Sequence, residues 1–196
     1  VYRADHPHLN RQVVIKVGKH ASDESRQQEV ISEGRTLASL SHPNLAQVFD
    51  LQFEDGRPYL VMEYIEGQNL QERLKDKKLP ADAAADLTAA IAQAMQHAHD
   101  KGVVHRDLKP ANVVIHTADG TPKVIDFGLA QTKSAYSDQD VSSAYGGTIA
   151  YMAPEQAKLL LKGPSGENST DHRVDVFALG AMLFEMLTGK QLYEFT

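Results

Sequence analysis

The chain contains no cysteine among its 196 residues. This absence excludes disulfide bonds and thiolate-ligated metal sites, and it is compatible with a reducing compartment. An excess of positive charge is also missing, because 26 acidic residues against 20 basic ones give a net charge of −6. Proteins that bind nucleic acid normally present a basic face. We therefore predict no nucleic-acid partner.

Long apolar runs are absent as well. The most apolar long stretch, Val174–Leu187, contains Asp175 and Glu185 and is shorter than the roughly 20 residues that a membrane-spanning helix needs. We predict a buried helix there and no membrane segment in this chain. No internal repeat is present, and no low-complexity segment is long enough to matter. With 42% apolar residues, the chain can bury a substantial core in one domain or two small ones.

The first residues predict two strands. No basic and apolar leader precedes them, and Val1–Ala4 has the pattern of the middle of a strand, so we expect the chain to begin at a domain boundary. Val13–Val17 is a β-branched run, and residues 7–12 before it have the composition of a turn. Lys16 is therefore a charge inside a strand.

A helix is predicted over residues 22–40. Its apolar residues recur at helical spacing, at Val30, Leu37 and Leu40. Glu33 falls on the same stripe and therefore points towards the core. A buried carboxylate persists only when it has a partner, and Lys16 is the simplest candidate. The alternative is a solvated Glu33 and a Lys16 side chain that extends to solvent.

Two more strands are predicted at Leu45–Phe53 and Tyr59–Tyr64, joined by a turn that contains Gly56 and Pro58. Residues 66–69 then break the pattern. We interpret this break as the boundary between a strand-rich N-terminal part and a helix-rich remainder.

The remainder predicts two long helices. Pro80 opens the first and Gly102 closes it, while Arg173–Thr188 forms the second and Gly189 caps it. Between them, residues 159–172 are predicted to form an irregular excursion on the surface.

The stretch His105–Asn112 places an aspartate, a lysine and an asparagine between two apolar runs, Val103–Val104 and Val113–Ile115. We predict a loop between two short strands, which is where a scaffold usually presents reactive side chains. Asp126–Gly128 ends another short strand. The long aperiodic segment 129–147 follows it and is typical of a functional loop.

Together these stretches resemble the catalytic domain of eukaryotic-type Ser/Thr protein kinases, in a bacterial-like form. The matching motifs, in the family's order, are VVIK ending at Lys16, the helical Glu33, HRDLKPAN from His105, DFG from Asp126, GTIAYMAPE from Gly147 and DVFALG from Asp175. Six ordered motifs are far more specific than any one alone. The resemblance implies an α+β, two-lobed fold. A small antiparallel β-sheet lobe with one helix would span residues 1–65, and a mainly helical lobe residues 66–196.

The resemblance also implies a reaction, the transfer of the γ-phosphoryl group of ATP to a Ser or Thr hydroxyl of a protein substrate. This chemistry depends on positioning and charge neutralisation. By resemblance, Asp107 would accept or orient the hydroxyl proton and Lys109 would contact the transferring phosphate. Asn112 and Asp126 would bind Mg²⁺ through oxygen, the ligand type that this cation prefers. The alternative for Asp107, Asn112 and Asp126 is that they cap turns.

Nucleotide-binding residues are assigned by the same resemblance. Lys16 would hold the α- and β-phosphates and would be oriented by Glu33. The adenine pocket would comprise Val1, Val14, Met62, Glu63, Ile65 and Val114. Residues 63–65 would be the hinge whose backbone binds adenine, and Met62 would close the back of the pocket. Val14 stands where the family usually has alanine, so we expect a narrower pocket.

Two further expectations follow from the resemblance. An internal stack is expected from His105, Phe127, Leu37 and Phe49. Arg106 before Asp107 implies control by phosphorylation of the loop after Asp126, because a phosphate would give this cation a charge-assisted partner. Ser142 and Ser143 are the best-placed acceptors.

The resemblance is incomplete at both ends. The family's glycine-rich loop would precede Val1, and its last helices would follow Thr196, so we expect exposed apolar surface near the C-terminus. The resemblance implies a cytoplasmic location, as a free domain or as the cytosolic part of a larger or membrane-anchored protein. It gives no indication of the oligomeric state.

Two other functions are compatible with the fold. The first is a pseudokinase-type nucleotide-binding or scaffolding module, which usually lacks one or more of the residues present here as Lys16, Asp107, Asn112 and Asp126. The second is a small-molecule kinase of related fold, which rarely contains a segment like Gly147–Glu155.

Overall fold

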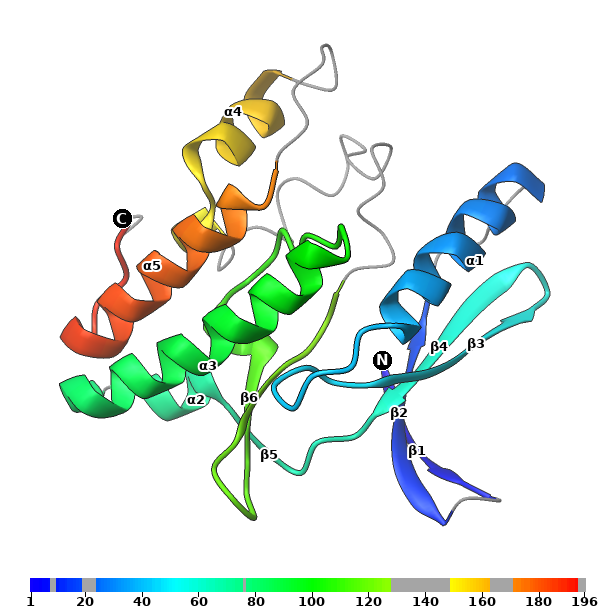
Figure 1. Ribbon diagram of the computed structural model, residues 1–196, viewed down its shortest axis with the longest axis horizontal. Helices are drawn as coiled ribbons and strands as arrows, with labels where there is room; N and C mark the ends of the chain where they lie inside the picture. Colours follow the sequence, from blue (N-terminus) through cyan, green and yellow to red (C-terminus); the bar gives the residue numbers. More distant parts are fainter. Residues whose placement is uncertain (8–9, 19–23, 76, 128–148, 163–170, 194–196) are drawn as a thin grey trace.

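The structure is a computed structural model. It describes residues 1–7, 10–18, 24–75, 77–127, 149–162 and 171–193. Its elements form two groups, a four-stranded sheet accompanied by one helix and a set of helices around a small three-stranded sheet (Figure 1). The predicted α+β, two-lobed architecture is confirmed.

The first group contains the four strands in the order β1-β2-β4-β3, all antiparallel. Its elements are β1 (Tyr2–His6), β2 (Arg11–Val17), α1 (Glu24–Ala38), β3 (Val48–Glu54) and β4 (Arg57–Glu63). Asp55 and Gly56 join β3 to β4 with φ values of 48° and 72°, the left-handed pair that a two-residue hairpin turn requires. The predicted hairpin is therefore confirmed.

A β-bulge interrupts β3. Val48 pairs with Met62 and Asp50 with Val61, which leaves Phe49 as the extra residue. Val48 packs against the core, whereas the guanidinium carbon of Arg11 lies 3.6 Å from the centre of the Phe49 ring. The expected place of Phe49 in the internal stack is therefore not observed, because the bulge changes which side chain of β3 points inward.

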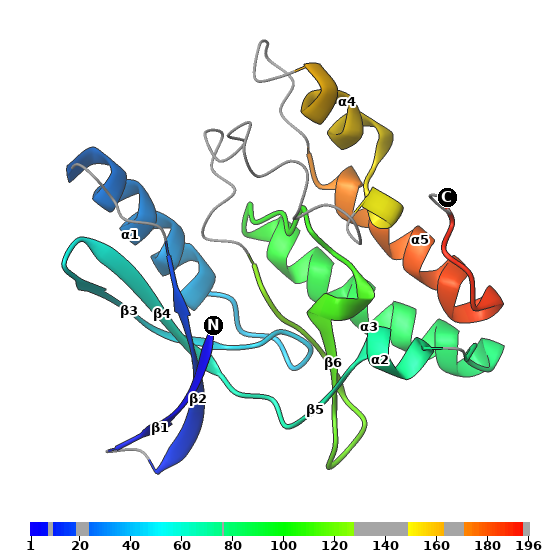
Figure 2. The ribbon, with the colours of Figure 1, turned by 180° about the vertical axis from the view of Figure 1, so that it is seen from behind.

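The second group contains a three-stranded antiparallel sheet in the order β5-β6-β7. Its elements are β5 (Gly67–Asn69), α2 (Leu70–Leu74), α3 (Ala81–Asp100), β6 (Val113–His116), β7 (Pro122–Val124), α4 (Pro154–Lys162) and α5 (Arg173–Thr188), with short 3₁₀ turns at Pro110–Asn112 and Ile149–Tyr151. Helices α3 and α5 pack side by side, as both views show (Figures 1 and 2).

The predicted ends of the long helices agree with the structure. Pro80 occupies the N-cap position of α3, and Gly102 follows the helix with a left-handed φ of 75°. Gly189 caps α5 with a φ of 73°, and its N–H donates to the carbonyl of Glu185. Glycine adopts this conformation without steric cost, which is why it ends helices.

Two local predictions were wrong. Residues 159–162 belong to α4, so the irregular excursion begins later than predicted. Val103 and Val104 do not form a strand. The N–H of Val103 instead donates to the carbonyl of Ala98 at the end of α3, and this bond closes the helix.

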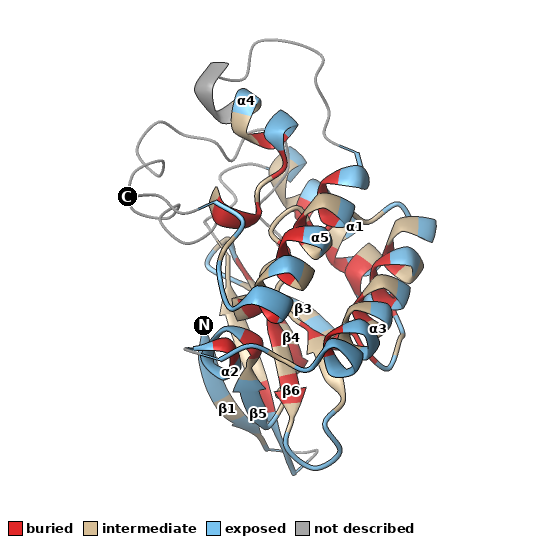
Figure 3. Ribbon diagram, turned by 90° about the vertical axis from the view of Figure 1, so that its left-hand side faces the viewer, coloured by how far each residue is buried: buried red, intermediate tan, exposed pale blue. Residues whose placement is uncertain are grey.

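The hydrophobic core runs from one group of elements into the other. Leu37 of α1 and Leu60 of β4 belong to the same buried cluster as Ile91 of α3 and Met182 of α5. Buried residues in Figure 3 follow β4, β6 and the inner side of α5. Towards the C-terminal end, five large apolar side chains are exposed, as predicted: Val176, Phe184, Leu187, Leu192 and Tyr193. Within the described ranges, no helix combines the length and apolarity that crossing a membrane requires.

Candidate functional site

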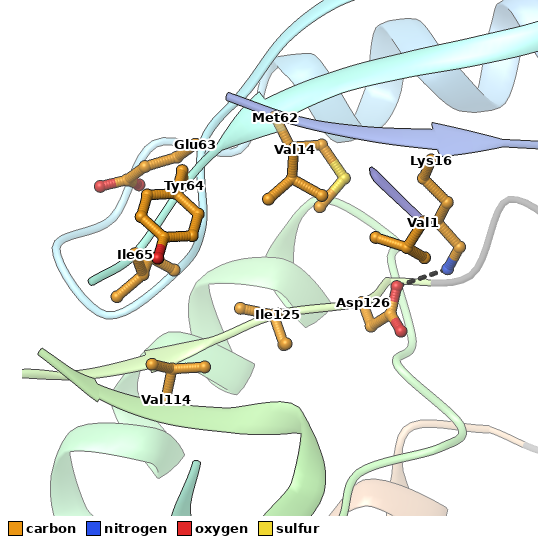
Figure 4. A pocket seen from close by; sticks show the side chains of 10 residues that line it. All are labelled: Val1, Val14, Lys16, Met62, Glu63, Tyr64, Ile65, Val114, Ile125 and Asp126. Carbon is orange, nitrogen blue, oxygen red and sulfur yellow. Dashed lines mark hydrogen bonds and ion pairs between the residues drawn. The ribbon is translucent and has the colours of Figure 1, made fainter. Parts of the chain in front are cut away.

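A cavity of about 220 Å³ lies between the four-stranded sheet and the β6–β7 hairpin (Figure 4). It is lined by Val1, Val14, Lys16, Met62, Glu63, Tyr64, Ile65, Val114, Ile125 and Asp126. Seven of the eight predicted nucleotide-binding residues are among them, and Glu33 is not. The cavity also includes Asp126, one of the two predicted metal ligands.

Apolar side chains form two opposite walls of this cavity. Val14 and Met62 face each other across the β2–β4 pair, so their side chains lie on the same side of the sheet. Val114 of β6 and Ile125 lie on the opposite side (Figure 4). Such an arrangement suits a flat, largely apolar ring. Sequence reasoning did not identify Ile125, although it directly precedes Asp126.

The side chain of Glu63 points away from the centre of the cavity (Figure 4). Its two carboxylate oxygens accept hydrogen bonds from Lys123 Nζ at 2.7 and 2.8 Å, and one also accepts from the backbone N–H of Gln47 at 3.1 Å. The segment after β4 is thereby tied to β7. Lys123 was not predicted, although a single cation in a short strand before Asp126 was a signal of the same kind as Lys16 in β2.

Lys16 forms an ion pair at the end of the cavity opposite the hinge residues. Its Nζ lies 2.5 Å from Asp126 Oδ1, and both side chains are partly exposed. Asp126 has a left-handed φ of 70°, a conformation that non-glycine residues seldom adopt. This geometry brings the predicted phosphate-binding cation and a predicted metal ligand into contact.

The expected pairing of Lys16 with Glu33 is not made. Among the described residues, Lys16 pairs with Asp126 instead, and Glu33 Oε2 is buried without a hydrogen-bond partner. Burial raises the pKa of Glu33, and the positive charges of Arg26, Arg106 and Lys16 oppose this effect only in part. The helical spacing correctly placed Glu33 towards the interior, but the choice of partner depends on how α1 lies relative to the cavity.

The loop between α3 and β6 brings Asp107, Lys109 and Asn112 together. Lys109 Nζ lies 2.9 Å from one carboxylate oxygen of Asp107 and 3.2 Å from the other. Asn112 Nδ2 donates to the backbone carbonyl of Asp107 at 2.8 Å and to its carboxylate at 3.2 Å. The N–H of Ile125 donates to the carbonyl of Asn112 at 2.9 Å, so the chain segments that contain Asn112 and Asp126 run next to each other.

The buried carboxylate of Asp175 accepts hydrogen bonds from the backbone of this loop. Asp175 Oδ1 accepts from the N–H of Arg106 at 2.8 Å, while Oδ2 accepts from the N–H of His105 at 2.9 Å and from His99 Nε2 at 2.8 Å. Burial alone would raise the pKa of Asp175, but the hydrogen bond from His99, the electrostatic interaction with His105 and the backbone hydrogen bonds outweigh it and lower this pKa. A role for Asp175 was predicted only as part of the DVFALG motif, although a carboxylate within an apolar helix was a usable signal.

The histidine of the loop is also fixed in place. His105 Nδ1 accepts from the N–H of Asp107 at 3.2 Å, and Nε2 donates to the carbonyl of Ile125 at 3.0 Å. Its ring lies 4.8 Å from that of Phe127, as the predicted stack requires. The phosphorylation candidates Ser142 and Ser143, and Gly128, lie outside the described residues.

The fold and this arrangement of side chains define a protein kinase catalytic domain. The family model described as "Protein kinase domain" matches residues 1–195, and the chain belongs to this family.

Comparisons with individual proteins agree with this assignment. The chain is 37% identical to a probable serine/threonine-protein kinase of Clostridium perfringens over 195 residues, which are 96% of this chain and 27% of that protein. It is also 37% identical to the serine/threonine-protein kinase PrkC of Bacillus subtilis, over 97% of this chain and 28% of PrkC. The crystal structure of the Mycobacterium tuberculosis PknI kinase domain superposes with a TM-score of 0.73 at 26% identity, covering 98% of this chain and 70% of that one. The chain thus spans little more than a quarter of the length of these curated relatives.

Proposed function

We propose that the protein containing this chain is an ATP- and Mg²⁺-dependent kinase that phosphorylates Ser or Thr hydroxyls of protein substrates. The observation that supports this proposal is the meeting of two sets of residues. Lys16 and Asp126 form one end of the cavity, and the loop of Asp107, Lys109 and Asn112 lies beside the strand that leads to Asp126. Under this proposal the lobes comprise residues 1–65 and 66–196, and catalysis takes place in the cytoplasm, where ATP is available.

The apolar walls of the cavity would hold the adenine ring of ATP. Val14 and Val114 would contact its two faces, and the backbone of residues 63–65 would provide hydrogen bonds at its edge, because the Glu63 carboxylate is bound to Lys123. Val14 has two methyl groups more than alanine. This bulk narrows the space above the ring, so we expect tight contact with an unsubstituted purine.

Lys16 would bind the phosphates at the other end of the cavity. Its amine is already held there by Asp126, at 2.5 Å. Phosphate oxygens would compete with Asp126 for this cation, and Glu33, with one buried oxygen that has no hydrogen-bond partner, could then take up the vacated side of the Lys16 amine. The nucleotide would thus exchange one ion pair for another.

Asn112 and Asp126 fit a magnesium ion, because both present oxygen atoms and lie on adjacent segments. In the described ranges, no group of three or more His, Cys, Asp or Glu side chains is placed to hold a metal by itself. A site of two protein ligands that is completed by phosphate oxygens and water is the arrangement usual for Mg²⁺. Bound there, the ion would neutralise charge on the phosphate oxygens.

Asp107 would orient the acceptor hydroxyl. Its carboxylate is held by Asn112 and by Lys109, so its direction is fixed before the substrate arrives. Lys109 would stabilise negative charge on the transferring phosphoryl group, because its amine already lies next to the carboxylate that receives the hydroxyl proton.

The test is phosphate transfer from γ-labelled ATP by the full-length protein, with its own chain and a generic Ser/Thr-containing protein as acceptors. We expect Mg²⁺-dependent labelling that the Asp107→Asn and Asp126→Asn substitutions abolish and that the exposed Asp171→Asn substitution leaves unchanged. Labelling that persists in both active-site variants would contradict the assignment. A Mg²⁺-nucleotide shift in melting temperature without transfer would instead indicate a pseudokinase-type binding module.

A further inference from the structure

Gln156 lies in the first turn of α4 with a relative exposure of only 7%. Both ends of its side-chain amide are used. Oε1 accepts a hydrogen bond from the backbone N–H of Ala153 at 3.1 Å, and Nε2 donates to the backbone carbonyl of Arg106 at 2.8 Å. The side chain therefore joins the segment that leads into α4 to the residue directly before Asp107.

The Arg106 peptide is held in a conformation that needs support. Arg106 has a left-handed φ of 63°, which costs free energy in a residue with a side chain. Asp175 holds its N–H and Gln156 holds its carbonyl. Asp175 also anchors His105 and His99, whereas Gln156 contacts the Arg106 carbonyl from the start of α4. The direction of this carbonyl and that of the following residue, Asp107, are set by the same peptide unit.

We propose that Gln156 is a positioning residue for phosphoryl transfer. By holding the Arg106 carbonyl, it fixes the orientation of Asp107 relative to Ala153 and the start of α4. The effect on turnover rests on the proposed kinase function, but the contact itself does not. Gln156 is not among the residues that line the cavity, so its loss should slow transfer without weakening ATP binding.

Two substitutions separate this role from simple packing. Gln156→Met has nearly the same size and removes both hydrogen bonds. Gln156→Glu retains an acceptor for the N–H of Ala153 but, when ionised, has no proton to donate to the Arg106 carbonyl. When protonated, its carboxyl group restores the donor and the acceptor together. Burial raises the pKa of a carboxyl group, so this change of state falls within a practical pH range.

The experiment measures kcat and KM for ATP in the full-length protein between pH 6 and pH 8, with rates normalised to sites that bind Mg²⁺-nucleotide. We expect kcat of Gln156→Met to fall roughly 10- to 100-fold at every pH, with KM for ATP unchanged within about twofold. The kcat of Gln156→Glu, relative to the unsubstituted protein, should rise as the pH is lowered, because the protonated form is the active one. Gln96→Met is the matched control, since the Gln96 side chain is exposed and donates to the nearby Asp100 of the same helix at 2.7 Å.

A Gln156→Met variant with normal kcat, or a Gln156→Glu variant whose relative kcat does not depend on pH, would overturn the proposal. Because rates are normalised to sites that bind Mg²⁺-nucleotide, a loss of folded protein does not imitate this pH dependence. If the unsubstituted protein transfers no phosphate, the proposed function fails and amide hydrogen exchange decides this inference. Gln156→Met should then accelerate exchange of the Ala153 N–H, which donates to Gln156 Oε1, but not in the middle of α3, and unchanged exchange at Ala153 would refute the contact.

Discussion

The buried carboxylate of Asp175 provides a quantitative test of how the loop at residues 105–112 is held. Asp175→Asn preserves the size of the side chain but replaces one accepting oxygen by an NH₂ group. Three donors now point at the carboxylate, the N–H groups of His105 and Arg106 and the ring of His99. After the substitution, at least one of these donors faces another donor.

The expected cost follows from these contacts. Asp175 is 1% exposed, so water cannot replace a lost partner. A hydrogen bond to a charged group contributes about 1.5–3 kcal/mol, and a buried donor left without a partner costs about 1–3 kcal/mol. We therefore expect the free energy of unfolding to fall by about 3–5 kcal/mol, the range known for breaking a buried charged pair. For a chain of this size, that loss lowers the melting temperature by roughly 6–20 °C.

The pH dependence gives the prediction its sign. The pKa of Asp175 is lowered in the folded state, so its contribution to stability is fully present above the ordinary value of 3.8 and is lost as the pH falls through the folded-state pKa. The difference in unfolding free energy between the parent and Asp175→Asn should be constant from pH 5 to pH 8. Below about pH 4 it should shrink.

Denaturant unfolding followed by circular dichroism measures this difference, with melting temperatures as a second measurement. Asp171→Asn is the control, because Asp171 precedes the same helix but is exposed and pairs with Arg173, which is exposed as well. It should cause no measurable change. A loss below about 1 kcal/mol for Asp175→Asn, or a difference that grows as the pH falls below 4, would refute the reasoning.

Two further predictions concern backbone contact and an unpaired charge. An added Cβ at Gly67 would lie 2.1 Å from the carbonyl oxygen of Ile115, so Gly67→Ala should lower the unfolding free energy by about 1–3 kcal/mol. Gln68→Ala, at the exposed neighbouring residue, is the control and should not lower it. Equal effects of the two substitutions would contradict the close approach. The raised pKa of Glu33 means that its ionised form is disfavoured in the folded state. Glu33→Gln should therefore be at least as stable as the parent at pH 8, and its stability relative to the parent should decrease towards pH 5. Denaturant unfolding measures both. A variant less stable than the parent at pH 8 would show that Glu33 has a partner in solution.

Local sequence signals predicted the ends of the helices well. Pro80, Gly102 and Gly189 act through their own backbone preferences, so their effect does not depend on distant residues. The same is true of the turn at Asp55 and Gly56. The strand prediction for Val103–Val104 was wrong because the β-branched side chains give only a weak preference for a strand. The N–H of Val103 donates instead to a carbonyl at the end of α3.

The inward side chain of β3 could not be predicted from alternation. A bulge shifts the period by one residue, and no glycine or proline next to Val48 and Phe49 signals it. The partner of Lys16 was unpredictable for a different reason. Asp126 and Glu33 both carry a carboxylate, and the distance from each to Lys16 depends on the placement of α1 and of the segment after β7, which is a property of the whole fold.

The β6–β7 hairpin sets where the length of this sequence can vary. Asn112 directly precedes the hairpin and Asp126 follows it. Val114, which lines the cavity, pairs with Lys123, and Lys123 forms the ion pair with Glu63, so the register of the two strands holds both residues in place. An insertion in the turn at residues 117–120 lies at the far end and leaves this alignment intact. A single residue inserted between Val124 and Asp126 would displace the Asp126 side chain and would separate it from Asn112, the other proposed oxygen ligand of Mg²⁺. Homologous chains should therefore differ in length in the turn and keep a constant count on the two strands.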